Sequence, residues 1–194
     1  MLAVTGFNSK IVQELLLMLP EEDVRHVKPP YSGHMDAERY LLCAGVIHPK
    51  TIRQQTQTQI RTTMNVNLLW PMQFCERILE HNDHARICVL GSESGYSWSY
   101  DGVYAASKAA LHQYVETKKL KPDQQLVCLA PSIIADTGMT QSRTDIKNLA
   151  AREKKHPKGR FLKAAEVARA IYFLLYQDRG YITGTVVRMN GGGR

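Results

Sequence analysis

The chain has 194 residues, of which 44% are hydrophobic, and it carries a formal net charge of +7. This size and apolar content predict one globular domain, residues 1–194, with a substantial core. The basic residues are mostly scattered and not interleaved with aromatic rings, which argues against nucleic-acid binding, and no apolar run approaches the roughly 18 residues of a membrane span.

The location expected for the protein is cytoplasmic. The N-terminal residues, MLAVTGFNSK, lack the basic and then apolar layout of a secretory signal. The four cysteines are widely spread, without a C-x-x-C pair, and three stand in apolar runs. We therefore expect buried, reduced thiols and neither disulfides nor a metal site.

Short apolar runs alternate with helical stretches along the chain. The expected strands span 2–6, 23–27, 39–47, 85–92, 124–134 and 184–192. The expected helices span 10–19, about 53–80, 103–119 and 164–177, and the polar segment 136–163 is expected to be a loop. Continuous apolar strands separated by helices predict an α/β fold, a doubly wound Rossmann-type parallel sheet with helices on both faces. Such sheets bind ligands beyond the carboxyl ends of their strands.

The helix expected at 103–119 carries a tyrosine and a lysine four residues apart, Tyr104 and Lys108. Residues at this spacing share one face of a helix, so both side chains can act on one ligand. A nearby cation favours the phenolate, which would make Tyr104 a usable general acid or base. The same spacing also fits a packed tyrosine beside a solvated lysine, and the pair alone does not decide between them.

Small or polar residues stand where the expected strands end. The first strand ends in Thr5-Gly6, and the following Asn8 and Ser9 can cap the next helix. The later strand ends are Ala44-Gly45, Gly91-Ser92 and Pro131-Ser132, the last followed by Thr137. Each of these pieces alone could be an ordinary turn or cap.

Seven segments in this order make the chain resemble the short-chain dehydrogenase/reductase family over nearly its whole length. They are VTGFNSKI, LLCAGV, NVNLL, VLGSESG, YAASKAAL, APSIIADTGM and YITGTVVRMNGG. The resemblance implies an oxidoreductase that transfers a hydride between NADP(H) and a carbonyl or secondary alcohol by a Ser-Tyr-Lys mechanism. Tyr104 would be the acid or base at the substrate oxygen. Lys108 would lower its pKa and hold the nicotinamide ribose.

Two further catalytic residues follow from the same resemblance. Ser92 would position the substrate carbonyl by a hydrogen bond, with Ser94 as the alternative serine. Asn67, which reproduces the family's Val-Asn-Leu and is preferred over Asn65, would hold a water that links Lys108 to solvent.

A dinucleotide site is implied as well. Its residues would be Gly6, Asn8, Ser9, Lys10, Arg25, Ala44, Gly45, Tyr104, Lys108, Pro131, Ser132 and Thr137. The second strand offers Arg25 and His26 at its end, with no acid after Asp23, which favours NADP over NAD, although NAD stays open.

The chain departs from the family pattern in its first half. Lys10 and Val12 replace two glycines of the cofactor loop, and those glycines normally let the backbone approach the pyrophosphate. Lys10 could compensate with its charge, or could simply be solvated. The stretch from Gly6 to Ala44 is also short by about one α/β unit of roughly 30 residues. We therefore expect a shortened first half, with the second strand followed by only a proline-containing link.

The substrate is expected to be a small carbonyl or alcohol compound, and the basic segment 136–163 allows it to be anionic. The alternative for that segment is a solvated loop. Its cations are Arg143, Lys147, Arg152, Lys154, Lys155, Lys158 and Arg160. The family resemblance implies a homodimer or homotetramer built on the helices at about 60–80 and 104–119.

Two other functions stay open. A degenerate member of the family could keep the fold and act as a binding or regulatory protein, since two loop glycines are lost. A lyase, epimerase or dehydratase on a nucleotide sugar could use the same tyrosine and lysine with a retained cofactor.

Overall fold

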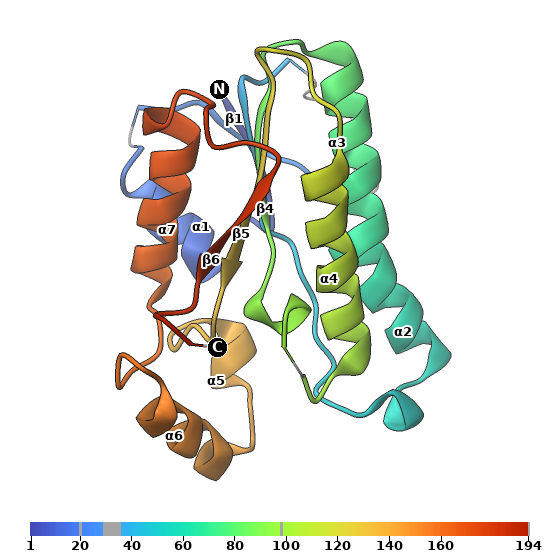
Figure 1. Cartoon of the computed structure of the whole chain (residues 1–194), viewed down its shortest axis with the longest axis vertical. Coiled ribbons are helices and arrows are strands. Elements are labelled where there is room, and N and C mark those ends of the chain that lie inside the picture. Colours follow the sequence, from blue (N-terminus) through green and yellow to red (C-terminus); the bar gives the residue numbers. More distant parts are fainter. Residues whose placement is uncertain (20, 29–35, 98, 194) are drawn as a thin grey trace.

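The computed structural model describes residues 1–19, 21–28, 36–97 and 99–193. Six strands form one parallel sheet in the order β2-β1-β3-β4-β5-β6 (Figure 1). They are β1 (Leu2–Thr5), β2 (Val24–His26), β3 (Arg39–Leu42), β4 (Arg86–Leu90), β5 (Gln125–Pro131) and β6 (Thr185–Met189). The α/β parallel sheet expected from the apolar runs is confirmed.

Helices cover both faces of this sheet. The α-helices are α1 (Lys10–Leu16), α2 (Gln57–Met64), α3 (Trp70–His81), α4 (Gly102–Thr117), α5 (Gly138–Gln141), α6 (Ile146–Lys155) and α7 (Ala164–Tyr172). Two π segments, Asn65–Leu69 between α2 and α3 and Phe173–Gln177 after α7, continue their helices. In Figure 1, α1 and α7 lie on one face, and α3 and α4 lie on the other. No helix in the described ranges is long and apolar enough to cross a membrane.

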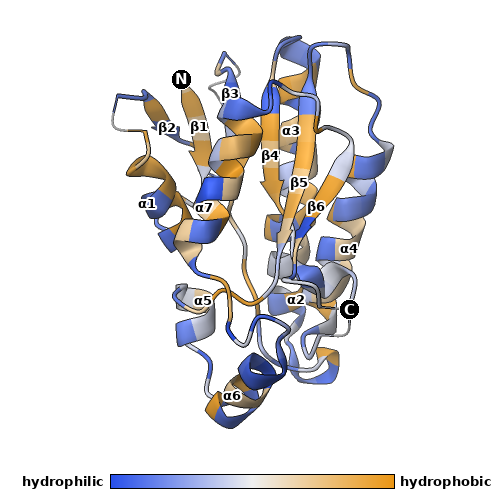
Figure 2. Ribbon diagram, turned by 60° about the vertical axis from the view of Figure 1, so that its left-hand side comes forward, coloured by the Kyte–Doolittle hydropathy of each residue, from blue (hydrophilic) through white to orange (hydrophobic). Residues whose placement is uncertain are grey.

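Alternate strand residues pack into two separate hydrophobic cores, one on each face of the sheet. Leu2 and Val4 pack with α1 and α7, where Ile11 and Val167 are buried. Ala3, between them, points to the other face, where Phe74 of α3 lies in the core. Because both faces are covered, the strands are apolar almost throughout, as the hydropathy colours of Figure 2 show.

The strand order reverses between β1 and β3, the second and third strands of the sheet. β2 has three residues and forms the edge, pairing only with β1 among the described strands. The chain then crosses to β3 on the opposite side of β1. This reversal of strand order makes the carboxyl ends of β1 and β3 the expected place for a ligand. The proline-containing link predicted after β2 falls largely in residues 29–35, outside the described ranges.

The prediction of a loop over 136–163 is wrong, because this segment contains α5 and α6. The residues of α6 are mostly good helix formers, and Arg152, Lys154 and Lys155 in its last turn favour the negative end of the helix dipole. No residue of α6 is buried. Its charge and exposure therefore obscured a helix that lies beyond the carboxyl ends of the strands (Figures 1 and 2).

Candidate active site

The ends of β1 and β3 approach each other closely at Gly6. Its φ of +71° is a conformation that side chains rarely adopt, and an added Cβ would lie 2.8 Å from the Ala44 backbone nitrogen. The Ala44 N–H donates to the Thr5 side-chain oxygen at 3.1 Å. Glycine at this position therefore lets the ends of β1 and β3 lie close together, with no side chain between them.

Tyr104 and Lys108 share one face of α4, as their spacing predicts. Both side chains are buried, with 7% and 3% of their surface exposed. The Lys108 Nζ atom lies 5.9 Å from the centre of the Tyr104 ring and donates a 2.6 Å hydrogen bond to the Leu90 carbonyl. A solvated lysine is therefore excluded, and the ammonium is held at the carboxyl end of β4.

Ser92, rather than Ser94, is the serine that meets the tyrosine. The Ser92 side chain is near enough to the Tyr104 phenol to lower its pKa. It also accepts a hydrogen bond from the Ser94 backbone N–H at 3.2 Å. Ser92 directly follows Gly91 at the end of β4 and caps the short 3₁₀ turn Glu93–Gly95. Ser92, Tyr104 and Lys108 are thus brought together by one strand end and one helix.

Burial controls the acidity of this cluster. It raises the pKa of Tyr104, outweighing the hydrogen bond from Ser92, which lowers it, while the Asp101 charge raises it further. The role expected for Lys108, to bring the pKa of the phenol down, stays a prediction, because the rise comes from burial and from Asp101. Burial also lowers the pKa of Lys108 to about 8. At neutral pH Tyr104 is a protonated phenol beside a lysine that is still mainly charged.

Asn67 lies in the π segment between α2 and α3 and is fully buried. Its side-chain oxygen accepts from the Val46 N–H at 2.9 Å, and its amide nitrogen donates to the Val46 carbonyl at 2.8 Å. A Cβ on Gly45 would lie 3.6 Å from the Asn67 oxygen and 4.0 Å from the Lys108 nitrogen. Asn67 therefore fixes the chain after β3 beside Lys108.

Asp101 supports the start of α4, and sequence reasoning missed it. The carboxylate is 1% exposed and accepts from the Tyr104 N–H at 3.0 Å, the His48 N–H at 2.9 Å and the Gln55 side chain at 2.9 Å. An aspartate just before a helix is a common N-cap signal, but its partners at 48 and 55 are too distant in sequence to be read from a pattern.

We expect Asp101→Ala to lower the free energy of unfolding by about 2–4 kcal/mol, because it removes a cap and leaves buried donors unpaired. Urea unfolding followed by circular dichroism measures this loss. Asp101→Asn, which keeps one acceptor oxygen, should lose less. Equal unfolding free energies for Asp101→Ala and the unmodified protein would contradict this assignment.

Three further candidate cofactor residues form a helix cap or ion pairs near the ends of β1 and β2. Ser9 caps α1 by accepting from the Ile11 N–H at 3.2 Å, and its hydroxyl lies 3.6 Å from the Cys43 sulfur. Lys10 forms an ion pair with Glu14 at 2.9 Å, and Arg25 forms one with Asp23 at 3.2 Å. Each of these cations is therefore paired with a carboxylate that is close to it in the sequence.

The segment after β5 passes close to β6. The Ser132 N–H donates to the Met189 carbonyl at 3.0 Å, while the Ser132 hydroxyl is buried without a hydrogen-bond partner in the described structure. Thr137 stands just before α5, and its hydroxyl donates to the Ile134 carbonyl at 3.3 Å. Pro131 is the last residue of β5, and Asn8 lies in the turn before α1.

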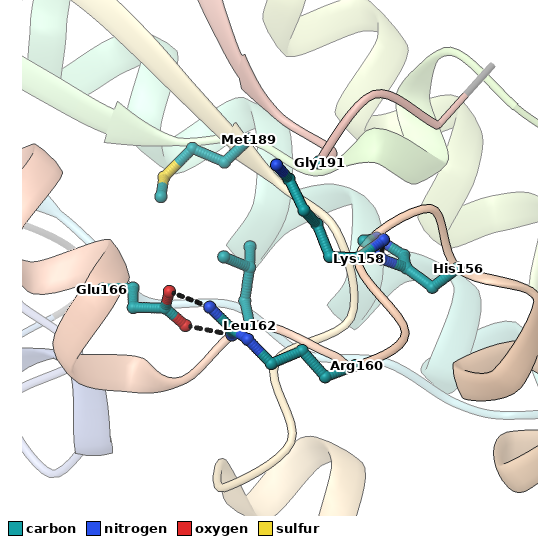
Figure 3. A pocket seen from close by; sticks show the side chains of 7 residues that line it. All are labelled: His156, Lys158, Arg160, Leu162, Glu166, Met189 and Gly191. Carbon is teal, nitrogen blue, oxygen red and sulfur yellow. Dashed lines mark hydrogen bonds and ion pairs between the residues drawn. The ribbon is translucent and has the colours of Figure 1, made fainter.

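A separate cavity of about 320 Å³ lies beside the end of β6 (Figure 3). Its described lining is His156, Lys158, Arg160, Leu162, Glu166, Met189 and Gly191. Both outer nitrogens of Arg160 donate to Glu166 at 2.7 Å. None of the four candidate catalytic residues lines this cavity, so it is distinct from the Tyr104 cluster.

Curated relatives match most of the chain. The family model described as Enoyl-(Acyl carrier protein) reductase matches residues 34–193. The 3-oxoacyl-[acyl-carrier-protein] reductase of Homo sapiens is 30% identical over 184 residues, covering 89% of this chain and 73% of the relative. The acetoacetyl-CoA reductase of Allochromatium vinosum is 26% identical over 158 residues, covering 77% and 63%. The chain therefore spans about two thirds to three quarters of the length of these relatives.

Solved structures share the fold at lower sequence identity. A short-chain dehydrogenase/reductase from Brucella melitensis has a TM-score of 0.82 at 19% identity, with 98% of this chain and 95% of that chain covered. Levodione reductase has a TM-score of 0.81 at 17% identity, with 98% and 96% covered. Together with the matched family model and the human relative, these likenesses show that the chain belongs to the short-chain dehydrogenase/reductase family of oxidoreductases.

Proposed function

We propose that the protein reduces a 3-oxoacyl thioester to the 3-hydroxyacyl thioester with NADPH. The observation that carries the proposal is the buried phenol of Tyr104, which lies near Ser92 and beside Lys108 at the carboxyl ends of the strands. A phenol whose pKa is raised stays protonated at neutral pH, which suits it to give a proton to a carbonyl oxygen. The substrate class is supported by the names of the relatives.

The dinucleotide would bind where the ends of β1 and β3 approach each other, because no side chain of Gly6 or Gly45 blocks the backbone there. Gly6 and Gly45 present bare backbone, and an added side chain at Gly6 would collide with Ala44. Arg25 on the exposed edge strand would bind the 2′-phosphate of NADPH. It would then give up its ion pair with Asp23. Lys10 would similarly have to leave Glu14 to reach a phosphate. The remaining contacts would come from Asn8, Ser9, Ala44, Lys108, Pro131, Ser132 and Thr137.

In the proposed reaction the nicotinamide, when bound, supplies the hydride that reaches the carbonyl carbon. Ser92 holds the carbonyl oxygen, and Tyr104 transfers its phenolic proton to that oxygen as the alcohol forms. The charged Lys108 stabilises the phenolate that results. The Asn67 oxygen, which has a second lone pair, would hold a water through which the proton is replaced from solvent.

We expect the rate of reduction to fall as pH rises through about 8, where Lys108 loses its proton. The direction follows because the neutral amine no longer stabilises a phenolate, while Tyr104, whose pKa is raised, stays protonated there. The measurement is kcat/KM for reduction from pH 6 to 10. A profile that stays flat through this range would contradict the role given to Lys108.

Substrate charge and assembly are further parts of the proposal. The basic segment 136–163, with Arg143, Lys147 and Lys158 among its cations, supports an anionic substrate. A homodimer or homotetramer would form on α3 and α4, the helices used by the family, and Leu69 just before α3 is 44% exposed. We place the protein in the cytoplasm.

The test is to incubate purified protein with NADPH and acetoacetyl-CoA and to follow the absorbance of NADPH. Consumption of NADPH with formation of the 3-hydroxy product supports the proposal. A folded protein that consumes no NADPH with acetoacetyl-CoA or a longer 3-oxoacyl thioester would overturn it. A binding or regulatory role is the second candidate, favoured by the lost loop glycines at Lys10 and Val12, and it predicts dinucleotide binding without turnover.

A further inference from the structure

The loop that carries Ser92 is tied to the last strand of the sheet. Arg188 of β6 donates from two nitrogens to the Glu93 carboxylate, at 2.8 and 2.7 Å. The side-chain nitrogen of Asn190 lies 3.5 Å from the same carboxylate. Glu93 is the residue next to Ser92, so the position of the serine depends on residues almost one hundred positions away in the sequence.

Tyr96, four residues after Ser92, contacts two flat side chains. The Arg188 guanidinium carbon is 4.4 Å from the centre of the Tyr96 ring. The ring of His112 is 4.7 Å from the Tyr96 ring, tilted by 30°. An arginine stacked on an aromatic ring is attracted by the negative charge of the ring face. Arg188, Tyr96 and His112 therefore form one stack, which we call the serine-loop clamp.

His112 connects this stack to the backbone of Ser92. It lies four residues after Lys108 on the same face of α4 and is 3% exposed. Its Nε2 atom accepts from the Ser92 backbone N–H at 3.4 Å. Burial lowers the pKa of His112 to about 4, so the ring is neutral at pH 7. The bond from Ser92 selects the tautomer with its proton on Nδ1, an atom that is buried without a hydrogen-bond partner in the described structure.

Two glycines leave the space that the imidazole occupies. A Cβ on Gly91 would lie 2.6 Å from the His112 Nε2 atom, and a Cβ on Gly95 would lie 2.5 Å from its Cε1 atom. Such contacts are shorter than real side chains allow. The glycines on either side of Ser92 thus let the loop close onto His112.

We propose that Arg188, Tyr96 and His112 are positioning residues that hold the Ser92 hydroxyl against Tyr104. The proposal rests on the proposed reduction, in which Ser92 holds the carbonyl oxygen. None of the three touches the reacting atoms in this account. A displaced catalytic group can cost about 10²-fold in rate, so loosening the clamp lowers kcat while the crossover that binds the cofactor is left intact.

The matched variants are Arg188→Met and Arg39→Met. Arg39 stands at the opposite end of the sheet, where it is 4.5 Å from the centre of the Tyr176 ring and pairs with Glu38. It is therefore the same kind of arginine–tyrosine–glutamate cluster, remote from Ser92. We expect Arg188→Met to lower kcat for acetoacetyl-CoA by about 10- to 100-fold with KM for NADPH unchanged. Arg39→Met should lower thermal stability but leave kcat unchanged.

His112→Phe is the second variant, since it keeps an aromatic ring on Tyr96 but removes the acceptor for the Ser92 N–H. It should lower kcat in the same way. Arg188→Lys, which keeps the charge on Glu93 but loses the flat stack, should fall between the unmodified protein and Arg188→Met. This milder variant preserves the test if Arg188→Met does not fold.

A readout without turnover separates this proposal from the proposed function. NMR of isotope-labelled tyrosine rings, with the Tyr104 signal identified by its loss in Tyr104→Phe, reports the surroundings of the phenol, including the position of the Ser92 side chain. We expect that signal to shift in Arg188→Met and His112→Phe but not in Arg39→Met. A signal that stays unshifted in both clamp variants, or that shifts equally in Arg39→Met, would overturn the proposal. If the unmodified protein turns over no thioester, the proposed function fails while the NMR comparison still decides the role of the clamp.

Discussion

Replacing Tyr104 with Phe is expected to lower kcat for reduction of acetoacetyl-CoA by about 10²- to 10⁴-fold, the usual contribution of a positioned general acid. The phenol is buried, contacts Ser92 and has a raised pKa, so at neutral pH it holds the proton that the product alcohol needs. The change removes only the hydroxyl and leaves the ring in place. NADPH affinity and thermal stability should therefore change little, and steady-state kinetics with a binding titration measure the difference.

Tyr114→Phe is the matched control on the same helix. Tyr114 is half-buried, and its hydroxyl donates to Glu76 of α3 at 2.8 Å, ten residues along α4 from Tyr104. Loss of that hydroxyl should leave kcat unchanged. If Tyr104→Phe retained the kcat of the unmodified protein, the proton would have to come from another group and Tyr104 would not be the acid.

Gly6→Val is the second change for which we expect a large effect. The φ of +71° strains any β-branched residue, and its Cβ would meet backbone atoms of Cys43 and Ala44 at 2.9 and 2.8 Å. Backbone atoms cannot rotate aside as a side chain can, so the ends of β1 and β3 must separate. We expect a loss of about 2–4 kcal/mol in unfolding free energy and a fall in NADPH affinity of more than about 100-fold.

Gly184→Val separates backbone strain from collision. Gly184 has a similar φ of +59°, but an added Cβ there meets nothing within 4 Å among the described atoms. It should lose stability through strain and keep its affinity for NADPH. Unfolding in urea and titration of nicotinamide fluorescence compare the two variants. Equal NADPH affinity for Gly6→Val and Gly184→Val would contradict a cofactor crossover at Gly6.

The sheet could be predicted from the sequence because its strands are buried on both faces. Runs such as 124–134 are apolar without interruption, and only a parallel sheet between two helical layers buries both sides of such a strand. The segment 146–155 carried no comparable signal. Its helix buries no residue and is strongly polar, so it lacks the apolar run that reveals the strands, and the charge that suggested a loop instead stabilises its last turn.

The Tyr104 cluster could be predicted only in part. The spacing of Tyr104 and Lys108 is a local property of one helix, which sequence reveals directly. The choice of Ser92 over Ser94 depends on where the strand ends, and the raised pKa of Tyr104 depends on burial by surrounding elements. The links from Arg188 and Asp101 join residues far apart in the chain, and a single sequence holds no trace of them.

We propose that this chain binds a nicotinamide dinucleotide at the crossover between β1 and β3 and uses it for reduction. The most direct measurement is titration of the purified protein with NADPH and with NADH, followed by nicotinamide fluorescence. The account predicts saturable binding that is tighter for NADPH, retained in Tyr104→Phe and lost in Gly6→Val. Absence of binding to either dinucleotide by a protein shown to be folded would contradict it.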